Sequence, residues 1–454
     1  MTGADSHKAD RRHPPARAGI VAVAALLVTC LAGSLVGCTT PSRDSSTDTE
    51  VRALIVWRHA GTDAEARVFA DQVDDFNATH PDIRVTVRTV AEGDYNDALQ
   101  TAVAAREVPD VAEIDGPLVD SYVYQDQLAD LDQLLPTEIV NAQLTSLRTQ
   151  GQVDGRTYSV AVFDSGLGLY ADRRQLRAAH VAWPTGPDDA WTAAEFSRVL
   201  ARLAARDDDA RVLDLKLNYG VGEWLTYGFA PLVASAGGDL IDHDTLSPVG
   251  HLDGDAAVRA LGTLAEWAPY VDPDTRDDAF TSRSVALSWV GHWVYRDYAA
   301  ALGDDLLVLP QPDLGHGSKS GQGSWSWAIT KSSRNQQAAA TFLTYLLGTD
   351  QVLRMTDANG AVPGTDDALD RSDLYGPQGP LRLFAAQLLA SCADAPPTTS
   401  CVSVPRPATP AYPTLSAQFS SAVSAALTGG DWRQALRVGT ERVQADLDAN
   451  DGYR

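Results

Sequence analysis

Apolar and polar positions follow two distinct periods along the chain, which predicts strands followed by helices. Residues 53–57 form a short apolar run of strand length, and residues 63–77 carry apolar side chains at helical spacing on one face. Residues 83–87 alternate apolar and polar positions as a half-buried strand does. A helical segment over 95–106 and a strand over 109–115 complete the series. This order predicts an α/β lobe whose helices cover a largely parallel sheet.

A second alternation of the same kind begins after Asp154-Gly155, a dipeptide that favours a turn. Residues 158–162 and 166–170 have the composition of extended segments. The further expected elements are a strand at residues 306–310 and helices at residues 173–180, 192–206, 335–347 and 418–447. A glycine-rich loop is expected over residues 311–323. We find no internal repeat, so the pattern predicts a second α/β region rather than a repeated array.

The beginning of the chain has the order of a secretory signal. A basic segment that ends at Arg17 precedes an uncharged, largely apolar stretch over residues 18–36. The stretch Leu35-Val36-Gly37-Cys38 resembles the cleavage site of a bacterial lipoprotein. We therefore expect residues 1–37 to be removed and Cys38 to carry the lipid, although about 18 apolar residues could also just span a bilayer. Residues 38–50 are polar and are expected to form a flexible tether.

The four cysteines fit an exported protein. Cys30 lies in the segment that is expected to be removed, and Cys38 takes the lipid. Cys392 and Cys401 remain, close together in a stretch rich in Ala, Pro, Thr and Ser. In an exported protein, a pair at this spacing predicts a disulfide. Two free thiols are the alternative.

Charge and motifs argue against several classes of function. The formal net charge of −24 opposes binding to the phosphate backbone of nucleic acids. The chain lacks Gly-x-Ser-x-Gly and His-Glu-x-x-His, and Asp272-Pro273-Asp274 lacks the glycine and glutamate of a calcium loop. We therefore expect a protein that is not an enzyme and that has no cofactor and no metal site. A secreted lipoprotein glycoside hydrolase stays as the alternative, because 60 acidic residues are enough to include a catalytic carboxylate pair.

A set of short motifs follows the signal in a characteristic order. The segments are Leu54-Ile55-Val56-Trp57, Phe76 to Val85, Pro109-Asp110-Val111 with Leu128 to Leu131, Asp154 to Asp172, Ala236-Gly237-Gly238, Gly291-His292-Trp293, Ala338 to Leu343 and Arg406 to Tyr412. As an ordered set they resemble the extracellular solute-binding protein family 1, the sugar-binding receptor subunits of ABC importers. The chain departs from the family at Ala161 and His292, which stand where proline is usual.

The resemblance implies an α/β fold of the type II periplasmic-binding-protein kind, in which crossover hinge strands join two α/β lobes. On this pattern, the N-terminal lobe comprises residues 51–162 and 310–347, and the C-terminal lobe comprises residues 163–309 and 348–454. The resemblance also implies a lipid-anchored receptor on the outer face of the cytoplasmic membrane, expected to be a monomer. Such a receptor captures a carbohydrate between its lobes and delivers it to the transmembrane subunits of an ABC permease. Ligands of the polyamine or glycerol phosphate type are the alternative.

The candidate ligand-binding residues follow from the chemistry of sugars, which present hydroxyl edges and apolar faces. A receptor needs aromatic planes for the faces and carboxylates or amides for the hydroxyls. The resemblance and the strand ends together select Trp57, His59, Asp115, Asp164, Trp224, Tyr227, Trp289, Trp293 and Trp325. Asp115 ends a predicted strand at the sheet edge where open α/β sheets bind ligands, and Asp164 lies at the expected crossover. The other tryptophans of the mature chain are expected to be structural: Trp183, Trp191, Trp267 and Trp432.

Overall fold

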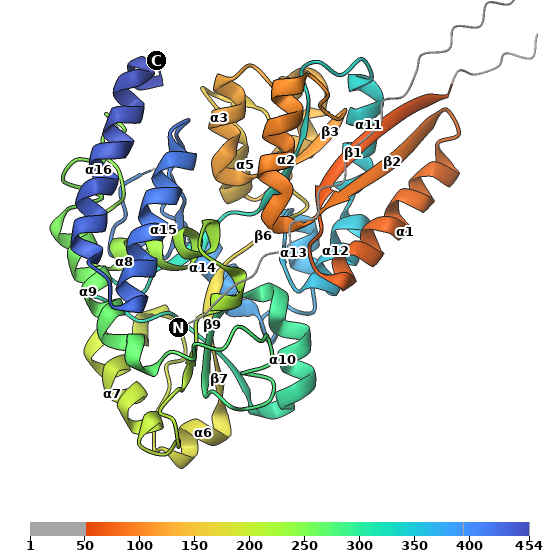
Figure 1. The fold of residues 1–454 in the computed structure, drawn as a ribbon. Helices are drawn as coiled ribbons and strands as arrows, with labels where there is room; N and C mark the ends of the chain where they lie inside the picture. Colours follow the sequence, from red (N-terminus) through yellow and green to blue (C-terminus); the bar gives the residue numbers. More distant parts are fainter. Residues whose placement is uncertain (1–50, 394, 454) are drawn as a thin grey trace, which may run out of the picture. The chain divides into compact units, whose positions relative to one another are not determined.

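The computed structural model describes residues 51–393 and 395–453 (Figure 1). The expected signal peptide (1–37), the tether (38–50) and the lipid-carrying Cys38 lie outside the described residues. Within the described ranges, none of the helices combines the length and the apolar content needed to cross a membrane.

The first lobe is built on a four-stranded sheet with the order β12-β3-β1-β2. Its elements are β1 (Arg52–His59), α1 (Asp63–Thr79), β2 (Ile83–Val90), α2 (Glu92–Ala105), β3 (Val111–Asp115), α3 (Val119–Tyr124), α4 (Thr137–Asn141), α5 (Thr145–Gly151), β4 (Gln152–Val153), β5 (Arg156–Thr157), β12 (Trp325–Ile329) and α11 (Gln336–Leu346). Strand β1 is parallel to both β2 and β3, and β12 joins antiparallel with Trp325 opposite Asp115. The predicted strand–helix alternation over residues 53–115 is confirmed, and a strand from a distant part of the chain completes the sheet.

Helix α12 (Thr349–Asn359) packs with the first lobe, whereas residues 348–454 were expected in the second. Val352 and Met355 share a buried cluster with Phe76 of α1, and the two helices lie side by side in Figure 1. An amphipathic helix buries its apolar face wherever a complementary surface is available. Here that surface is α1, so the chain stays with the first lobe for longer than its sequence pattern indicated.

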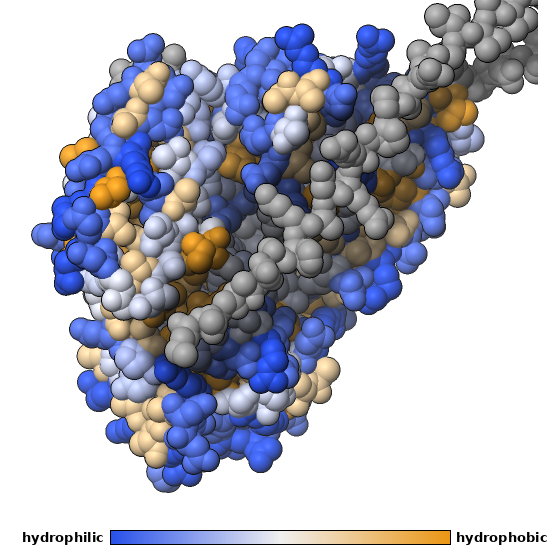
Figure 2. All heavy atoms as spheres, viewed as in Figure 1, coloured by the Kyte–Doolittle hydropathy of each residue, from blue (hydrophilic) through white to orange (hydrophobic). Residues whose placement is uncertain are grey.

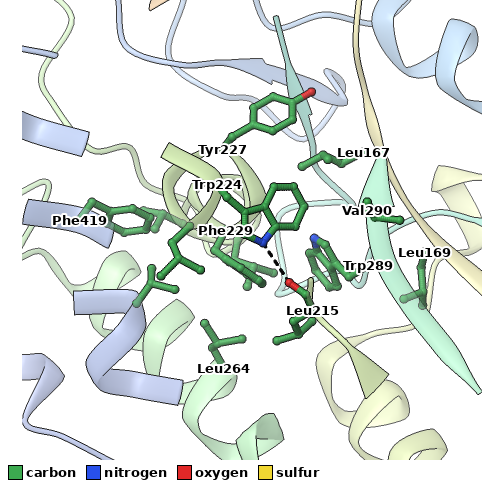
Figure 3. Packing of buried hydrophobic residues seen from close by; sticks show 14 of the residues in the cluster. Leu167, Leu169, Leu215, Trp224, Tyr227, Phe229, Leu264, Trp289, Val290 and Phe419 are labelled. Carbon is green, nitrogen blue, oxygen red and sulfur yellow. Dashed lines mark hydrogen bonds between the residues drawn. The ribbon is translucent and has the colours of Figure 1, made fainter. Parts of the chain in front are cut away.

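The second lobe is built on a sheet with the order β10-β7-β9-β8. Its elements are β7 (Leu167–Asp172), α6 (Arg173–Ala178), α7 (Ala193–Ala204), β8 (Leu213–Asp214), α8 (Glu223–Ser235), α9 (Asp255–Trp267), β9 (Leu287–Gly291), α10 (Tyr295–Leu302), β10 (Leu306–Leu309), α14 (Arg382–Leu389), α15 (Tyr412–Thr428) and α16 (Trp432–Ala449). Strand β7 is antiparallel to β9 and β10, while β8 is parallel to β9. Helices α8, α9 and α15 pack together, and Figure 3 shows the buried side chains between α8 and the sheet.

Short strands mark the places where the chain passes from one sheet to the other. The first passage runs through β6 (Phe163–Asp164), and the second, between β10 and β12, contains β11 (Ser320–Gln322). Strand β6 pairs antiparallel with β13 (Val362–Pro363), and β11 pairs parallel with β14 (Ser403–Pro405). The chain reaches the second lobe again after α13 (Asp366–Arg371), which packs on α12. These pairings place four distant segments of the chain together between the two sheets.

The predicted disulfide between Cys392 and Cys401 is present, with 4.9 Å between the two Cα atoms. The loop that it closes lies against Lys319, whose Nζ donates to Thr398 O at 2.7 Å and to Cys401 O at 2.5 Å. The side chain of Lys319 is buried, so these two carbonyls supply the partners that its ammonium group needs. The disulfide loop and the segment around β11 therefore stabilise each other.

Candidate functional site

An arginine lies between the two lobes and pairs with one carboxylate from each. Asp115 is the last residue of β3 in the first lobe, and Glu223 is the first residue of α8 in the second. Arg406 donates from Nη1 and Nη2 to the two carboxylate oxygens of Asp115, at 2.9 and 2.7 Å, and from Nη1 to Glu223 Oε1 at 2.7 Å. The side chains of Arg406 and Asp115 are only 7% and 8% exposed. The site is therefore organised around a buried ion-pair triad, Asp115–Arg406–Glu223.

Neighbouring side chains keep this triad aligned. Glu223 also accepts a hydrogen bond from the Tyr412 hydroxyl and one from Ser416 Oγ at 2.7 Å, both on α15. The guanidinium of Arg406 lies over the ring of Tyr227, 4.9 Å from its centroid, in a cation–π contact. Burial lowers the pKa of Arg406, but the two carboxylates outweigh this effect and raise that pKa well above its usual value. Burial raises the pKa of Glu223, and the guanidinium opposes the rise.

An aromatic group on the second lobe adjoins the triad through Tyr227. It comprises Tyr219, Trp224, Tyr227 and Trp293, whose neighbouring ring centroids are 5.2 to 6.5 Å apart. The Trp293 indole N–H donates to the Tyr219 hydroxyl at 2.9 Å. Tyr219 is 37% exposed and Trp293 is half-buried, so both rings remain accessible. Gly291 allows this arrangement, because a Cβ at that position would come within 2.1 Å of the Trp293 ring.

A second aromatic group lies on the first lobe. His59 and Trp325 stack with ring centroids 4.2 Å apart, and Tyr95 meets Trp325 edge to face at 5.4 Å. Glu113 Oε2 lies 2.8 Å from His59 Nδ1 and accepts from the backbone N–H of His59 at 2.9 Å. His59 is buried and Trp325 is half-buried. Because Trp325 lies opposite Asp115 in the β12–β3 ladder, this stack borders the triad from the first lobe.

Asp164 is fully buried in the crossover strand β6. Its Oδ1 accepts from the backbone N–H groups of Ser165, at 2.7 Å, and Gly323, at 3.3 Å. It therefore connects the first passage between the sheets to the second. Burial raises the pKa of Asp164 to about 6, although hydrogen bonds and the charge of Arg406 act in the opposite direction. In this position Asp164 is a hinge residue rather than an exposed acceptor.

The structure places the nine predicted residues in different environments. Those that it brings together around the triad are Asp115, Trp224, Tyr227 and Trp293, with Trp325 and His59 on the first-lobe side. Trp289 is 1% exposed, stacks on Phe229 and donates its indole N–H to Gly228 O at 3.1 Å (Figure 3). Trp57 is buried in the first-lobe sheet with Arg88 over its ring at 4.0 Å. We therefore assign Trp289 to packing, in contrast to the expectation from the sequence, whereas a role of Trp57 in ligand binding stays a prediction.

Sequence reasoning missed the residue at the centre of the site. The motif that runs from Arg406 to Tyr412 assigns no role to either residue, and the sequence patterns do not single out Glu223 or Tyr219. Arg406 and Asp115 are 291 residues apart, so no local spacing relates them. One signal was available: Arg406 is the only charged residue between Asp394 and Asp431.

The described residues include no cluster of potential metal ligands, and the face seen in Figure 2 is largely hydrophilic. Across residues 51–393 and 395–453, no three or more His, Cys, Asp or Glu side chains are arranged to hold a metal ion. Hydrophilic residues dominate the face seen in Figure 2, and hydrophobic residues appear there in small separate groups. This surface fits the acidic composition of the chain.

Comparison with known proteins identifies one family. A family model described as "Bacterial extracellular solute-binding protein" matches residues 71–376, which cover more than half of the chain. A curated relative, an uncharacterized lipoprotein of Streptomyces antibioticus, is 34% identical over 136 residues. That match spans 29% of this chain and 29% of the relative, well under two thirds of its length.

Solved structures of binding proteins share the fold. The GacH receptor of Streptomyces glaucescens, solved unliganded and with acarbose, is 20% identical, with a TM-score of 0.73 over 89% of this chain and 100% of the receptor. A cyclic alpha-maltosyl-1,6-maltose binding protein from Arthrobacter globiformis is 23% identical, with a TM-score of 0.70 over 88% of this chain and 100% of that protein. An ABC substrate-binding protein from Listeria monocytogenes, in complex with cycloalternan, is 18% identical, with a TM-score of 0.73 over 88% and 100%. The predicted fold class is confirmed by these similarities.

Proposed function

Because this chain belongs to the bacterial extracellular solute-binding protein family, we propose that it is the receptor subunit of an ABC importer and that its ligand is a carbohydrate held between the two lobes. In this role the receptor delivers the ligand to the transmembrane subunits of a permease. The lobes close around a ligand that contacts both of them, since only differential contacts shift the open and closed populations.

The observation that carries the proposal is the combination of accessible aromatic rings with carboxylates where the lobes meet. Tyr219 and Trp293 offer planes on which the apolar face of a sugar can stack. Asp115 and Glu223 adjoin this aromatic group through Arg406, which covers the ring of Tyr227. Once Arg406 has moved away from Asp115, that carboxylate can accept charge-assisted hydrogen bonds from ligand hydroxyls. One lobe supplies Asp115 and the other supplies the rest, as a closing mechanism requires.

The similar structures support the same ligand class. The binding proteins from Streptomyces glaucescens, Arthrobacter globiformis and Listeria monocytogenes are described with acarbose, a cyclic maltosyl-maltose and cycloalternan, respectively. All three are oligosaccharides or mimics of them, so an oligosaccharide is the first ligand class to test. Neither a polyamine nor a phosphate suits the triad, because Arg406 and its two carboxylates already neutralise much of each other's charge.

Isothermal titration calorimetry against mono- and oligosaccharides, with spermidine and glycerol phosphate in the same panel, tests the proposal. We expect a neutral sugar to bind with Kd near 1 μM, which corresponds to about −8.2 kcal/mol. Chromatography of the ligand after incubation should show no new product. Release of cleaved sugar at catalytic rates would instead establish a glycoside hydrolase, and binding of spermidine alone would establish a polyamine receptor.

We also propose that Cys38 carries a lipid that anchors the receptor to the outer face of the cytoplasmic membrane. The motif Leu35-Val36-Gly37-Cys38 supports this assignment, as does the lipoprotein description of the Streptomyces antibioticus relative. Two or more acyl chains are needed for stable anchoring, at roughly 0.8 kcal/mol per buried CH₂. Cys38→Ser should release the protein into the medium or leave its precursor uncleaved. Mass spectrometry of the mature N-terminus checks this, and a mutant that stays on the membrane at the processed size would refute the anchor.

A further inference from the structure

We propose that Arg406 is a latch: its guanidinium holds the two lobes together by bridging Asp115 and Glu223, and a ligand takes its place on Asp115. The inference rests on the proposed function for its last step only, the exchange with a ligand. The bridge itself follows from the contacts of three residues that no motif assigned to a common site.

The latch is attached to the second lobe. Arg406 directly follows β14, and Glu223 begins α8, which packs against α15. Tyr412 and Ser416 on α15 hold Glu223 in place through hydrogen bonds to its carboxylate. Arg406 and Glu223 therefore move as one body with the second lobe, and the Arg406–Glu223 contact lies within that body.

The other half of the latch belongs to the first lobe. Asp115 ends β3, and its backbone pairs with Trp325 in the first sheet. Its two carboxylate oxygens take both terminal nitrogens of Arg406, which is the parallel bidentate geometry that makes guanidinium–carboxylate pairs strong and directional. Both side chains are almost completely buried, so solvent screens the pair little. This contact is broken when the lobes separate.

The closed arrangement also buries polar atoms that lack hydrogen-bond partners, and this unfavourable burial ends when the lobes open. Among the described residues, Arg406 Nε and Tyr227 Oη are buried without a hydrogen-bond partner. The two side chains are in contact, because the Arg406 guanidinium covers the Tyr227 ring. Buried polar groups without partners disfavour the state that buries them. The ion pairs therefore stabilise a closed state that is otherwise strained, and removing them should favour opening.

Ligand binding must then involve exchange at Asp115. Both of its carboxylate oxygens are engaged by Arg406, so a ligand hydroxyl reaches them only after the guanidinium has moved away. The same exchange leaves Arg406 paired with Glu223, close to the aromatic rings of the second lobe. Binding at Asp115 therefore costs the free energy of the Asp115–Arg406 ion pair. A ligand that makes few other contacts does not offset this cost, so the receptor selects against it.

The test is the distance between the lobes in the ligand-free mature protein. Spin labels at Asp97→Cys in α2 and Asp297→Cys in α10, both exposed positions, report that distance by double electron–electron resonance. Arg406→Gln should shift the distribution to a second, separated population, with the ratio of open to closed molecules raised on the order of tenfold, the scale of one hydrogen bond to a charged group. Asp115→Asn, which keeps the shape of the side chain, should produce the same shift.

Arg283→Gln is the matched control. Arg283 also pairs with two carboxylates, Asp172 at 2.6 Å and Asp305 at 3.3 Å, but all three residues belong to the second lobe. This variant loses a comparable ion-pair network and should keep the wild-type distance distribution. An equal shift of the distance distribution in Arg283→Gln would refute the latch, because it would show that the loss of any ion-pair network in the second lobe changes the distance between the lobes.

The outcomes separate the latch from the proposed function. Wild-type distances in folded Arg406→Gln and Asp115→Asn would refute the latch and leave carbohydrate binding untouched. If Arg406→Gln fails to fold, the distances in Asp115→Asn decide. Absence of sugar binding in calorimetry would refute the proposed function, while the ligand-free distances would still test the latch. With a sugar identified, stopped-flow measurements should show faster association in Arg406→Gln than in Arg283→Gln.

Discussion

Relative to the wild-type protein, the Asp164→Asn variant should gain about 2 kcal/mol of unfolding free energy as the pH rises from 4 to 6.5. Asp164 is fully buried at the crossover, and burial raises its pKa from 3.8 to about 6. In this pH range the folded protein holds a proton that the unfolded chain has already released. The stability that Asp164 contributes is therefore full below pH 4 and is lost as the pH rises through about 6. Asparagine cannot ionise, so the variant escapes that loss.

The His292→Gln variant should show the opposite trend over the same pH range. His292 is buried beside the same crossover, with Nε2 2.9 Å from Ser165 Oγ, and burial lowers its pKa from 6.5 to about 4. Between these values the unfolded chain binds a proton that the folded protein excludes, so the wild-type protein loses stability as the pH falls. Relative to wild type, His292→Gln should therefore lose about 3 kcal/mol as the pH rises from 4 to 6.5.

Urea unfolding at half-unit pH intervals between 4 and 7 measures both trends. The difference curves of the two variants should have slopes of opposite sign, which separates them from any general effect of mutation. Asp304→Asn removes an exposed carboxylate from the second lobe and serves as the control, with a curve parallel to wild type. Parallel curves for Asp164→Asn as well would show that Asp164 is hydrated in solution.

The second large effect separates two tryptophans that follow each other closely in the sequence. Trp289→Ala should lower the free energy of unfolding by about 3–5 kcal/mol, the usual cost of truncating a buried aromatic residue. Trp289 is 1% exposed, stacks on Phe229 and has its indole N–H bonded within the core (Figure 3). Trp293→Ala should change it by less than about 1 kcal/mol, because Trp293 is half-buried and contacts mainly other rings of the site.

The effects of the two substitutions on ligand affinity should have the opposite order to their effects on stability. Trp293→Ala should weaken carbohydrate binding by roughly 1–3 kcal/mol, the scale of stacking on an aromatic ring. Trp289→Ala, where it remains folded, should leave affinity nearly unchanged. Denaturant melts of the ligand-free variants and calorimetry with the identified sugar provide the two readouts. A large loss of stability in Trp293→Ala would make Trp293 a core residue and remove it from the site.

The periodicity of the sequence determined the local elements well. Strand β1, helix α1 and strand β2 were predicted from alternation and helical spacing alone. An element that packs on a core with one face has apolar residues at the positions of that face, so the period of the element is visible in its sequence. The disulfide was also predictable, since Cys392 and Cys401 are close in sequence and the chain has only two other cysteines. These features depend on neighbouring residues, and their physical causes are local.

Only the tertiary structure decided which distant residues meet. Arg406 pairs with Asp115 across 291 residues, and α12 packs on α1 rather than on the second lobe. The aromatic residues show the same limit: Trp289, within β9, lies in the core, whereas Trp293, just after the end of β9, lies at the site. Successive strand residues point to opposite faces, and what covers each face depends on segments far away in the chain. The spacing of residues in the sequence indicates which face of an element a side chain is on. Tertiary packing decides whether that face is covered by the core or borders the site.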